Sequence, residues 1–454
     1  MNSFLRDLLG AFSDGRRWLA DVTGRKSVTH DQLVELAEAL LSGRGEASGV
    51  AIAQEVLRGY GTLTGEARTA FFATLAERFG PDRERLAAAA EGFLAADGPD
   101  AQAEAALQRA SEPRRLELIR RLNLAPGGTA ALVSMREDLL AVLRDRPDLH
   151  PVDADFQYLF TSWFNRGFLT LRRMDWDTPA SILEKIIRYE AVHEIQGWDD
   201  LKRRIDMPDR RLYAFFHPAL ADEPLIFVQV ALMDEMADAI APVLATDRET
   251  VDGGHATTAI FYSISNTQVG LRGISFGNFL IKQVVEDLSR EFPSLKTFAT
   301  LSPVPGFRRW LDGEIAKGGE AVRALPRAAD ILPRLSGGDW IDDPAADKEM
   351  KPALQALASH YFLVARSPTG KVIDPVARFH LGNGARLERI NWRADLSEKG
   401  RRQSHGLMVN YLYDLKDIER NHEIFANKGE VVAAPAIARH LKALSLRKTA
   451  TAQE

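Results

Sequence analysis

The stretch TTAIFYSISNTQVGLRGISFGNFLIKQVVEDLSREFPSLKTFATL, residues 257–301, changes its pattern three times and thereby predicts the fold around it. It begins with a short run of aromatic and β-branched residues, which is typical of a buried strand. A glycine-containing loop follows, and apolar residues then recur at helical spacing as far as Phe292, where Pro293 ends the helix. A second β-rich run completes a strand–loop–helix–strand unit, which indicates a mixed α/β sheet.

Strand-like runs also lie before and after this unit. Each is short and rich in aromatic and β-branched residues, and two of them are edged by proline. Residues 308–360 have a helical pattern, and we expect them to form an insertion in the α/β part. The runs are RLYAFFHP (211–218) and PLIFVQVAL (224–232) before the unit, and ARLERINW (385–392) and GLMVNYLYDL (406–415) after it.

The first third of the chain has the pattern of a helical bundle. Apolar residues recur at positions i, i+3, i+4 and i+7 from about residue 29 to residue 146, between Gly, Pro and Asp breakers. Thr29 with Gln32 forms a plausible capping box at the start. Chemistry-bearing residues rarely cluster here, which favours a scaffold or oligomerisation domain.

The boundary between the two parts is expected around residues 147–157, where prolines and acids gather and the aromatic content then rises. The sequence therefore predicts an α+β protein with two domains. The first, residues 1–154, is an all-α helical bundle, and the second, residues 155–454, is a mixed α/β domain.

The composition excludes several classes of protein. The 454 residues are 45% apolar and 27% charged, with no cysteine and a net charge of -5 from 63 acids and 58 bases. Nothing resembles the basic stripe of a nucleic-acid binder or the long apolar run of a membrane helix. The first twenty residues make a poor secretory signal, so we expect a cytoplasmic protein.

No metal site is predicted, because the ten histidines are scattered and no HExxH pattern or thiol occurs. No dinucleotide fingerprint or biotinyl-lysine motif occurs either. The sequence therefore predicts chemistry by ordinary side chains, without a metal or a separate cofactor.

The loop QVGLRGISFGNF, residues 268–279, joins a strand to a helix and so directs backbone N–H groups and a helix N-terminus at whatever binds there. Such a loop suits a phosphate. It partly matches the R-x-x-G-x-G/A loop with which GNAT acetyltransferases hold the CoA pyrophosphate, although a serine replaces the first glycine; an ordinary turn is the alternative. The candidate cofactor-binding residues are Gln268, Gly270, Arg272, Gly273, Ser275 and Gly277.

The same loop contains G-I-S-F-G, which fits the nucleophile elbow of serine hydrolases with Ser275 at its centre. That interpretation requires a parallel α/β sheet with an acid and a histidine downstream. The mixed, aromatic-rich strands around the motif make it the weaker hypothesis.

Two further segments present isolated functional groups. TLSPVPGF, residues 300–307, places Ser302 in a stretch stiffened by prolines, which a plain turn would also explain. VIDPVARFHLGNGA, residues 372–385, is a predicted short helix with Asp374 as its N-cap. His380 lies near its end, where the helix dipole would favour the protonated imidazole, although a packing role is the commoner one. His405 is a rival histidine.

Long collinear motifs from about residue 155 to residue 415 resemble the malonyl-CoA decarboxylase family. The resemblance implies a GNAT-like fold for the second domain and an oligomerisation role for the first, so we expect a homo-oligomer such as a tetramer. The motifs are WFNRGFLTLRRMDWDTPASILEKI, EAVHEIQGWDDLKRRI, EPLIFVQVAL, FYSISNTQVGLRGISFGNFLIKQVV, TLSPVPGF, DPVARFHLGNGA, RINWRAD and GLMVNYLYDL.

The resemblance also implies a catalytic Ser–His pair, which falls on Ser302 and His380. Ser263 and Tyr413 match two further active-site positions. Some relatives carry a glutamate where this chain has Ser275, so an acidic contribution there cannot be carried over.

The implied reaction converts malonyl-CoA to acetyl-CoA and CO2, with the CoA thioester as the substrate. Loss of CO2 leaves an enolate, and one well-placed hydrogen-bond donor to the developing oxyanion contributes about 3 to 4 kcal/mol. Backbone N–H groups near the Gly-rich loop are candidate donors, and the helix from Gly277 would hold the pyrophosphate. Ser302 and His380 would then protonate the carbanion; an acyl-serine route would use the same pair.

Two other functions remain open at the level of sequence. An acyl-CoA-dependent N-acyltransferase would share the fold and the cofactor loop, but it would need an acceptor amine. A non-catalytic acyl-CoA-binding regulator would bind CoA tightly without releasing CO2.

Overall fold

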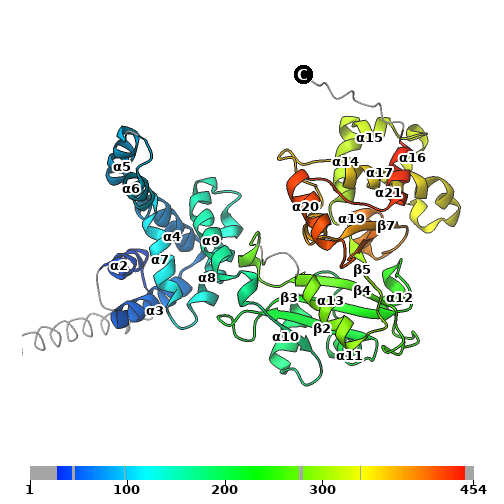
Figure 1. Ribbon diagram of the computed structural model, residues 1–454, viewed down its shortest axis with the longest axis horizontal. Coiled ribbons are helices and arrows are strands. Elements are labelled where there is room, and N and C mark those ends of the chain that lie inside the picture. Colours follow the sequence, from blue (N-terminus) through cyan, green and yellow to red (C-terminus); the bar gives the residue numbers. More distant parts are fainter. Residues whose placement is uncertain are drawn as a thin grey trace, which may run out of the picture. The chain divides into compact units, whose positions relative to one another are not determined.

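The computed structural model describes residues 28–42, 46–96, 98–274, 276, 280–337 and 339–444 (Figure 1). The chain divides into two compact units. The first comprises Met1–Leu169, His217–Ala221 and Gln268–Phe276, and the second comprises Thr170–Phe216, Asp222–Thr267 and Gly277–Glu454.

The first unit is helical, as the sequence predicts. The capping box is confirmed: Thr29 Oγ1 accepts from Gln32 N at 3.3 Å, and Gln32 Oε1 accepts from Thr29 N at 3.1 Å. The buried stripe of the first helix packs against its neighbours. The helices are α2 (His30–Leu41), α3 (Glu46–Thr62), α4 (Gly65–Arg78), α5 (Arg83–Ala95), α6 (Ala101–Ser111), α7 (Arg114–Asn123), α8 (Gly128–Val142) and α9 (His150–Trp163).

The second unit is built on a mixed sheet with the order β1-β2-β3-β4-β5-β8-β6, and β7 also pairs with β8. Among the named strands of the described residues, β4 and β5 pair in parallel and the other pairs are antiparallel. The predicted class, a helical part followed by a mixed α/β part, is confirmed. The strands are β1 (Thr170–Met174), β2 (Arg210–Phe216), β3 (Pro224–Met233), β4 (Thr258–Asn266), β5 (Thr297–Thr300), β6 (Ser302–Pro303), β7 (Arg386–Asn391) and β8 (Met408–Leu412).

The parallel pair β4 and β5 is short, and the two strands part where the candidate serines lie. Phe261 and Thr300 form the last residue pair, and Leu301 N still donates to Phe261 O at 3.0 Å. The chain then passes into β6, which pairs with β8. Strand β4 also carries a bulge here, because Gln229 of β3 lies opposite Ser263 while the next residue lies opposite Phe261.

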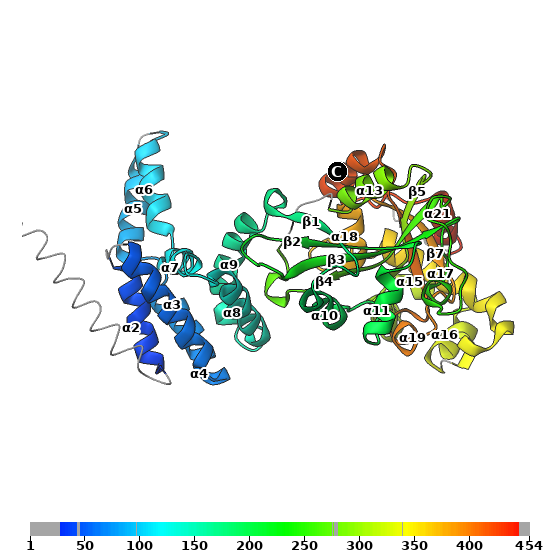
Figure 2. The ribbon, with the colours of Figure 1, turned by 90° about the horizontal axis from the view of Figure 1, so that it is seen from below.

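Helices cover the sheet on both sides. Figure 2 shows α13 (Leu280–Glu291) on one side and α10 (Ala180–Tyr189) with α11 (Trp198–Ile205) on the other. Helix α13 connects the parallel strands, as βαβ geometry requires, and its apolar stripe is buried. Residues of α10 and α11 share a core cluster with strands β2 and β3: Ile182, Leu183, Ile186, Leu201, Leu212, Ala214, Phe216 and Phe227.

Several helices lie between β6 and β7, and one of them carries a candidate histidine. No helix in the described ranges is long and apolar enough to cross a membrane. The helices between β6 and β7 are α14 (Phe307–Lys317), α15 (Glu320–Arg323), α16 (Ala328–Gly337), α17 (Asp347–Leu363) and α18 (Pro375–Gly382). After β7 come α19 (Glu398–Ser404), α20 (Ile418–Lys428) and α21 (Pro435–Lys442). The short helix α12 (Ile240–Leu244) lies between β3 and β4.

Candidate active site

Ser302 stands at the start of the two-residue strand β6, paired with Val409 of β8. Pro303 and Pro305 follow it and limit the freedom of the backbone. The residue is 5% exposed, and its hydroxyl donates to Thr300 Oγ1 at 2.8 Å. The serine is therefore held by both the backbone and a hydrogen bond.

His380 lies in the last turn of α18 and reaches Ser302. The predicted N-cap is confirmed, since Asp374 accepts from Ala377 N at 2.9 Å, and Pro375 occupies the first helical position. His380 Nε2 lies 3.1 Å from Ser302 Oγ, although the two residues are 78 positions apart in the sequence. The structure thus brings together the two residues of the predicted pair.

Tyr413 completes a hydrogen-bonded chain with these residues. Its hydroxyl lies 2.8 Å from His380 Nδ1, and burial raises the pKa of Tyr413 well above its ordinary value. The hydroxyl therefore stays protonated and can donate to Nδ1. In that tautomer the neutral imidazole carries its hydrogen on Nε2, which lies next to Ser302 Oγ.

The imidazole of His380 is neutral, which contradicts the expectation from the helix dipole. Burial lowers the pKa of His380 to about 3, because removing the ring from water disfavours the charged form. The helix dipole alone favours the protonated form, but desolvation of a side chain that is 2% exposed outweighs the dipole of an eight-residue helix.

Residues that the sequence did not single out support this chain. Thr300 is fully buried, and its Oγ1 also accepts from Tyr411 N at 3.1 Å. Asn410 Nδ2 donates to Thr300 O at 2.7 Å, and the ring of Tyr411 stacks on His380 at a centroid distance of 4.6 Å. The sequence could have indicated Thr300, because side chains alternate along a strand and Thr300 therefore lies on the same side as Ser302.

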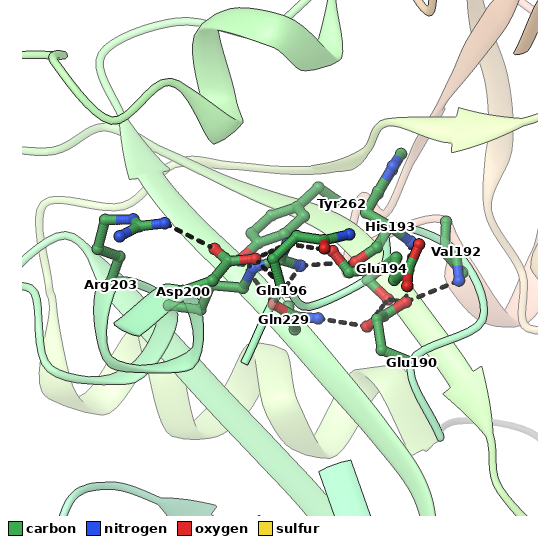
Figure 3. Close-up of polar contacts among 11 residues, drawn as sticks. Glu190, Val192, His193, Glu194, Gln196, Asp200, Arg203, Gln229 and Tyr262 are labelled. Carbon is green, nitrogen blue, oxygen red and sulfur yellow. Dashed lines mark hydrogen bonds and ion pairs between the residues drawn. The ribbon is translucent and has the colours of Figure 1, made fainter. Parts of the chain in front are cut away.

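Ser263 belongs to a separate cluster around the buried carboxylate of Glu190, whose neighbourhood Figure 3 shows. Ser263 Oγ donates to this carboxylate, at 2.8 Å from Oε1 and 2.7 Å from Oε2. Ser265 Oγ lies 3.2 Å from Oε1, and Gln229 donates to Oε2. The structure therefore joins three of the four predicted catalytic residues and places Ser263 with Glu190.

The backbone after α10 wraps around Glu190. Oε1 accepts from Val192 N at 2.7 Å and from His193 N at 3.0 Å. Lys399 of α19 donates to Ala191 O at 2.5 Å, which fastens this loop to a second element. Glu190 opens the motif EAVHEIQGWDDLKRRI, but its partners on β3 and β4 are distant in the sequence, so the motif does not show what the carboxylate binds.

Replacing Glu190 with alanine is expected to lower the free energy of unfolding by at least about 3 kcal/mol, because several buried donors lose their acceptor at once. Urea denaturation measures this loss. The matched control is Ser265→Ala, which removes one hydroxyl from the same cluster and should cost about 1 kcal/mol. Equal losses in the two variants would contradict the central role of the carboxylate.

The described part of the Gly-rich loop rests on helix α8 within the first unit. The buried guanidinium of Arg136 donates to Gly270 O at 2.7 Å and to Arg272 O at 2.9 Å, while its Nε bonds Asp153 at 2.8 Å. A Cβ at Gly270 would lie 2.0 Å from Val133 O. Gly270 is thus required for close packing, whatever the loop binds.

The remaining residues of this loop stay candidates for phosphate binding. Gly273 has φ +82, a conformation that favours glycine, and Gln268 precedes the short 3-10 helix Val269–Leu271. Ser275 and Gly277 lie outside the described residues.

The rival histidine lies elsewhere. His405 ends α19 with φ +53, and its ring contacts Trp340 at a centroid distance of 5.9 Å. Burial lowers the pKa of His405 to about 4. We therefore interpret His405 as a packing residue. Among the residues that the structure describes, no three His, Asp or Glu side chains gather as metal ligands would.

Family models and known proteins match most of the chain, including both segments that carry Ser302 and His380. The family model "Malonyl-CoA decarboxylase C-terminal domain" matches residues 167–451, and "Malonyl-CoA decarboxylase N-terminal domain" matches residues 79–164. The mitochondrial malonyl-CoA decarboxylase of Mus musculus is 35% identical over 399 residues, which cover 82% of this chain and 81% of that protein.

Two solved structures are more similar. The crystal structure of malonyl-CoA decarboxylase from Rhodopseudomonas palustris has 56% identity and a TM-score of 0.87, covering 91% of this chain and 100% of that chain. The corresponding structure from Agrobacterium vitis has 52% identity and a TM-score of 0.82, covering 90% of this chain and 99% of that chain.

Proposed function

The chain belongs to the malonyl-CoA decarboxylase family, and on that premise we propose that it is a carboxy-lyase that converts malonyl-CoA to acetyl-CoA and CO2. The observation that carries the proposal is the buried chain from Tyr413 through His380 to Ser302, which lies in the part matched by the C-terminal family model. Such a chain of hydroxyls and imidazole suits proton transfer.

In the proposed reaction, the bond between the malonyl carboxylate and Cα breaks, and its electron pair enters the thioester enolate. Ser302 positions the carboxylate and then gives its hydroxyl proton to Cα. His380 passes the Nε2 proton to Ser302 Oγ, and Tyr413 gives a proton to Nδ1 as it takes one from water, so that no tyrosinate is formed. The hydroxide left in the water combines with CO2 to give bicarbonate, and proton exchange with water then restores the hydrogen on Nε2. The imidazole stays neutral throughout, which agrees with its lowered pKa.

The same arrangement supports the direct route over an acyl-serine. A nucleophilic Ser302 would have to give its proton to His380, whereas Nε2 already carries a hydrogen in the proposed tautomer. Burial also makes the imidazole a weak base. Decarboxylation itself needs only donors for the enolate oxygen.

The CoA moiety is proposed to bind through the Gly-rich loop, with Arg272 and Gly273 at the pyrophosphate. We assign no metal or separate cofactor to the reaction. The helical first unit is proposed to join copies of the chain into a homo-oligomer.

The test is the release of CO2 and acetyl-CoA from malonyl-CoA by the purified, EDTA-treated protein. We expect equal amounts of the two products and no loss of rate after chelation. A rate lost with EDTA and restored by a divalent cation would refute the metal-free proposal. A folded protein that releases no CO2 would refute decarboxylation itself, and transfer from acetyl-CoA to added amines would then indicate an acyltransferase.

A further inference from the structure

A fully buried carboxylate, Asp374, lies between the two segments that carry the candidate catalytic residues. Its Oδ1 accepts from Ala377 N at 2.9 Å, and its Oδ2 accepts from Tyr361 OH of α17 at 3.2 Å. The backbone N–H groups of Val376 and Gly306 lie near enough to the carboxylate to lower its pKa. The N-termini of α18 and α14 therefore meet at one side chain, where their exposed N–H groups favour a negative charge.

The segment that carries Ser302 is fastened to Asp374 at Gly306. This glycine is the N-cap of α14 and follows the stiff Pro303 and Pro305. A Cβ at Gly306 would lie 2.6 Å from Tyr361 Oη and 3.8 Å from Asp374 Oδ2. Only glycine permits this close approach, so little freedom remains between the carboxylate and the serine.

The segment that carries His380 begins at Asp374. The carboxylate caps α18, and His380 lies within that same eight-residue helix. Helical backbone and Pro375 at the first position leave few ways for the imidazole to move relative to the cap. Both candidate catalytic groups are thus tied to the same carboxylate.

We propose that Asp374 is a positioning residue that holds Ser302 Oγ within hydrogen-bond distance of His380 Nε2, by binding Gly306 and the start of α18 together. This inference rests on the proposed function, because it assumes that the two residues act in one reaction. Asp374 itself touches neither catalytic side chain in any hydrogen bond described above.

The charge of this carboxylate is expected to depend on pH. Burial raises the pKa of Asp374 from 3.8 to about 6, against the hydrogen bonds from Ala377, Tyr361, Val376 and Gly306, which lower it. The titratable groups that face it are Tyr361 of α17 and Tyr411 of β8, and both stay protonated because burial raises their pKa. Arg309 of α14 and Arg378 of α18 add positive charge near Tyr361.

The pH changes stability and activity in opposite directions. Since the pKa of Asp374 is higher in the folded chain than in the unfolded chain, the folded state binds this proton more tightly. The free energy of unfolding that this group contributes is therefore lost as the pH rises from about 4 to 6. Activity rises over the same pH range, because the ionised carboxylate is the better acceptor for the N–H groups at the starts of α18 and α14. A loss of activity below about pH 6 is therefore not unfolding caused by this group.

The first variant is Asp374→Asn, which keeps the size of the side chain but removes its charge. Misplacement of the two reacting groups is expected to lower kcat between about 10-fold and 100-fold, with little change in KM. In the wild type, kcat/KM should fall below about pH 6, and this fall should be absent in the variant. Both proteins use the same substrate, so ionisation of its phosphates is common to them.

The matched variant is Tyr361→Phe, which leaves the charge but removes one hydrogen bond that lowers the pKa of Asp374. The fall in kcat/KM should move to higher pH in this variant. A residue with a merely structural role would leave the position of this fall unchanged. Tyr361→Phe also keeps the inference testable if Asp374→Asn does not fold.

A readout without substrate separates this inference from the proposed reaction. In crystal structures at pH 7.5, Asp374→Asn is expected to lengthen the distance from Ser302 Oγ to His380 Nε2 beyond the 3.1 Å of the wild type. A folded wild type without decarboxylase activity would refute the reaction and leave this distance to test the positioning. An unchanged distance together with wild-type kcat and pH dependence in Asp374→Asn would overturn the inference.

Discussion

Replacing Ser302 with alanine is expected to lower kcat for malonyl-CoA decarboxylation by at least about 100-fold, the scale of a lost acid–base group. The variant removes the hydroxyl that lies 3.1 Å from His380 Nε2 and 2.8 Å from Thr300 Oγ1. Without it, the proton on the imidazole has no relay to Cα. Initial rates of acetyl-CoA formation at saturating malonyl-CoA measure the effect.

The control for this variant is Ser359→Ala. Ser359 is also fully buried, but its hydroxyl bonds only the backbone, at 2.8 Å from Gln355 O within α17. The chemical change is identical, so kcat should stay within about 2-fold of the wild type, as expected for a residue outside the reaction. If Ser302→Ala were as active as this control, Ser302 would have no part in the mechanism.

Replacing His380 with alanine should lower kcat on a similar scale, at least about 100-fold. The change leaves the buried hydroxyls of Tyr413 and Ser302 without the imidazole that joins them. The exposed His255 supplies the control, since its side chain is 86% exposed and His255→Ala should leave kcat unchanged. Activity retained in His380→Ala would exclude the proposed relay while leaving the overall reaction open.

His380→Ala is also expected to change how stability depends on pH. The pKa of His380 is lowered from 6.5 to about 3 in the folded chain, so below pH 6.5 the unfolded chain binds more protons at this residue. The free energy of unfolding of the wild type therefore falls as the pH is lowered below 6.5. This group alone contributes at most about 1.4 kcal/mol per pH unit. Urea denaturation at pH 7 and pH 5 should therefore show a smaller acid loss in His380→Ala than in the wild type.

Local structure was predictable wherever neighbouring residues decide the backbone. The capping box of Thr29 and Gln32, the N-cap Asp374 and the strand around Ser263 are all found where the sequence places them. The two caps depend on contacts within a few residues, in which a side-chain oxygen accepts from the first turn of a helix, and the strand follows from its run of aromatic and β-branched residues. Periodicity then indicated which faces are buried.

The candidate site was predictable only in part. Ser302 and His380 were paired by resemblance to a family, because no local pattern links residues that are 78 positions apart. Ser263 was predicted beside them, yet its hydroxyl donates to Glu190, 73 positions away, and no local pattern links these two residues. Gly270 was read as part of a phosphate loop, and the structure adds a packing reason in the close approach of Val133.

The sequence by itself determined the helical first part, the strands of the mixed sheet other than β1 and β6, and the stiff segments that carry Ser302 and His380. Only the tertiary structure decided the charge of His380, the partner of Ser263 and the place of Asp374 between two helix starts. Backbone conformation follows from neighbours in the chain, whereas desolvation and hydrogen-bond partners depend on which distant residues close around a group. For this reason, the dipole of a short helix favours a protonated imidazole at His380, whereas burial by the rest of the fold lowers the pKa of this residue to about 3.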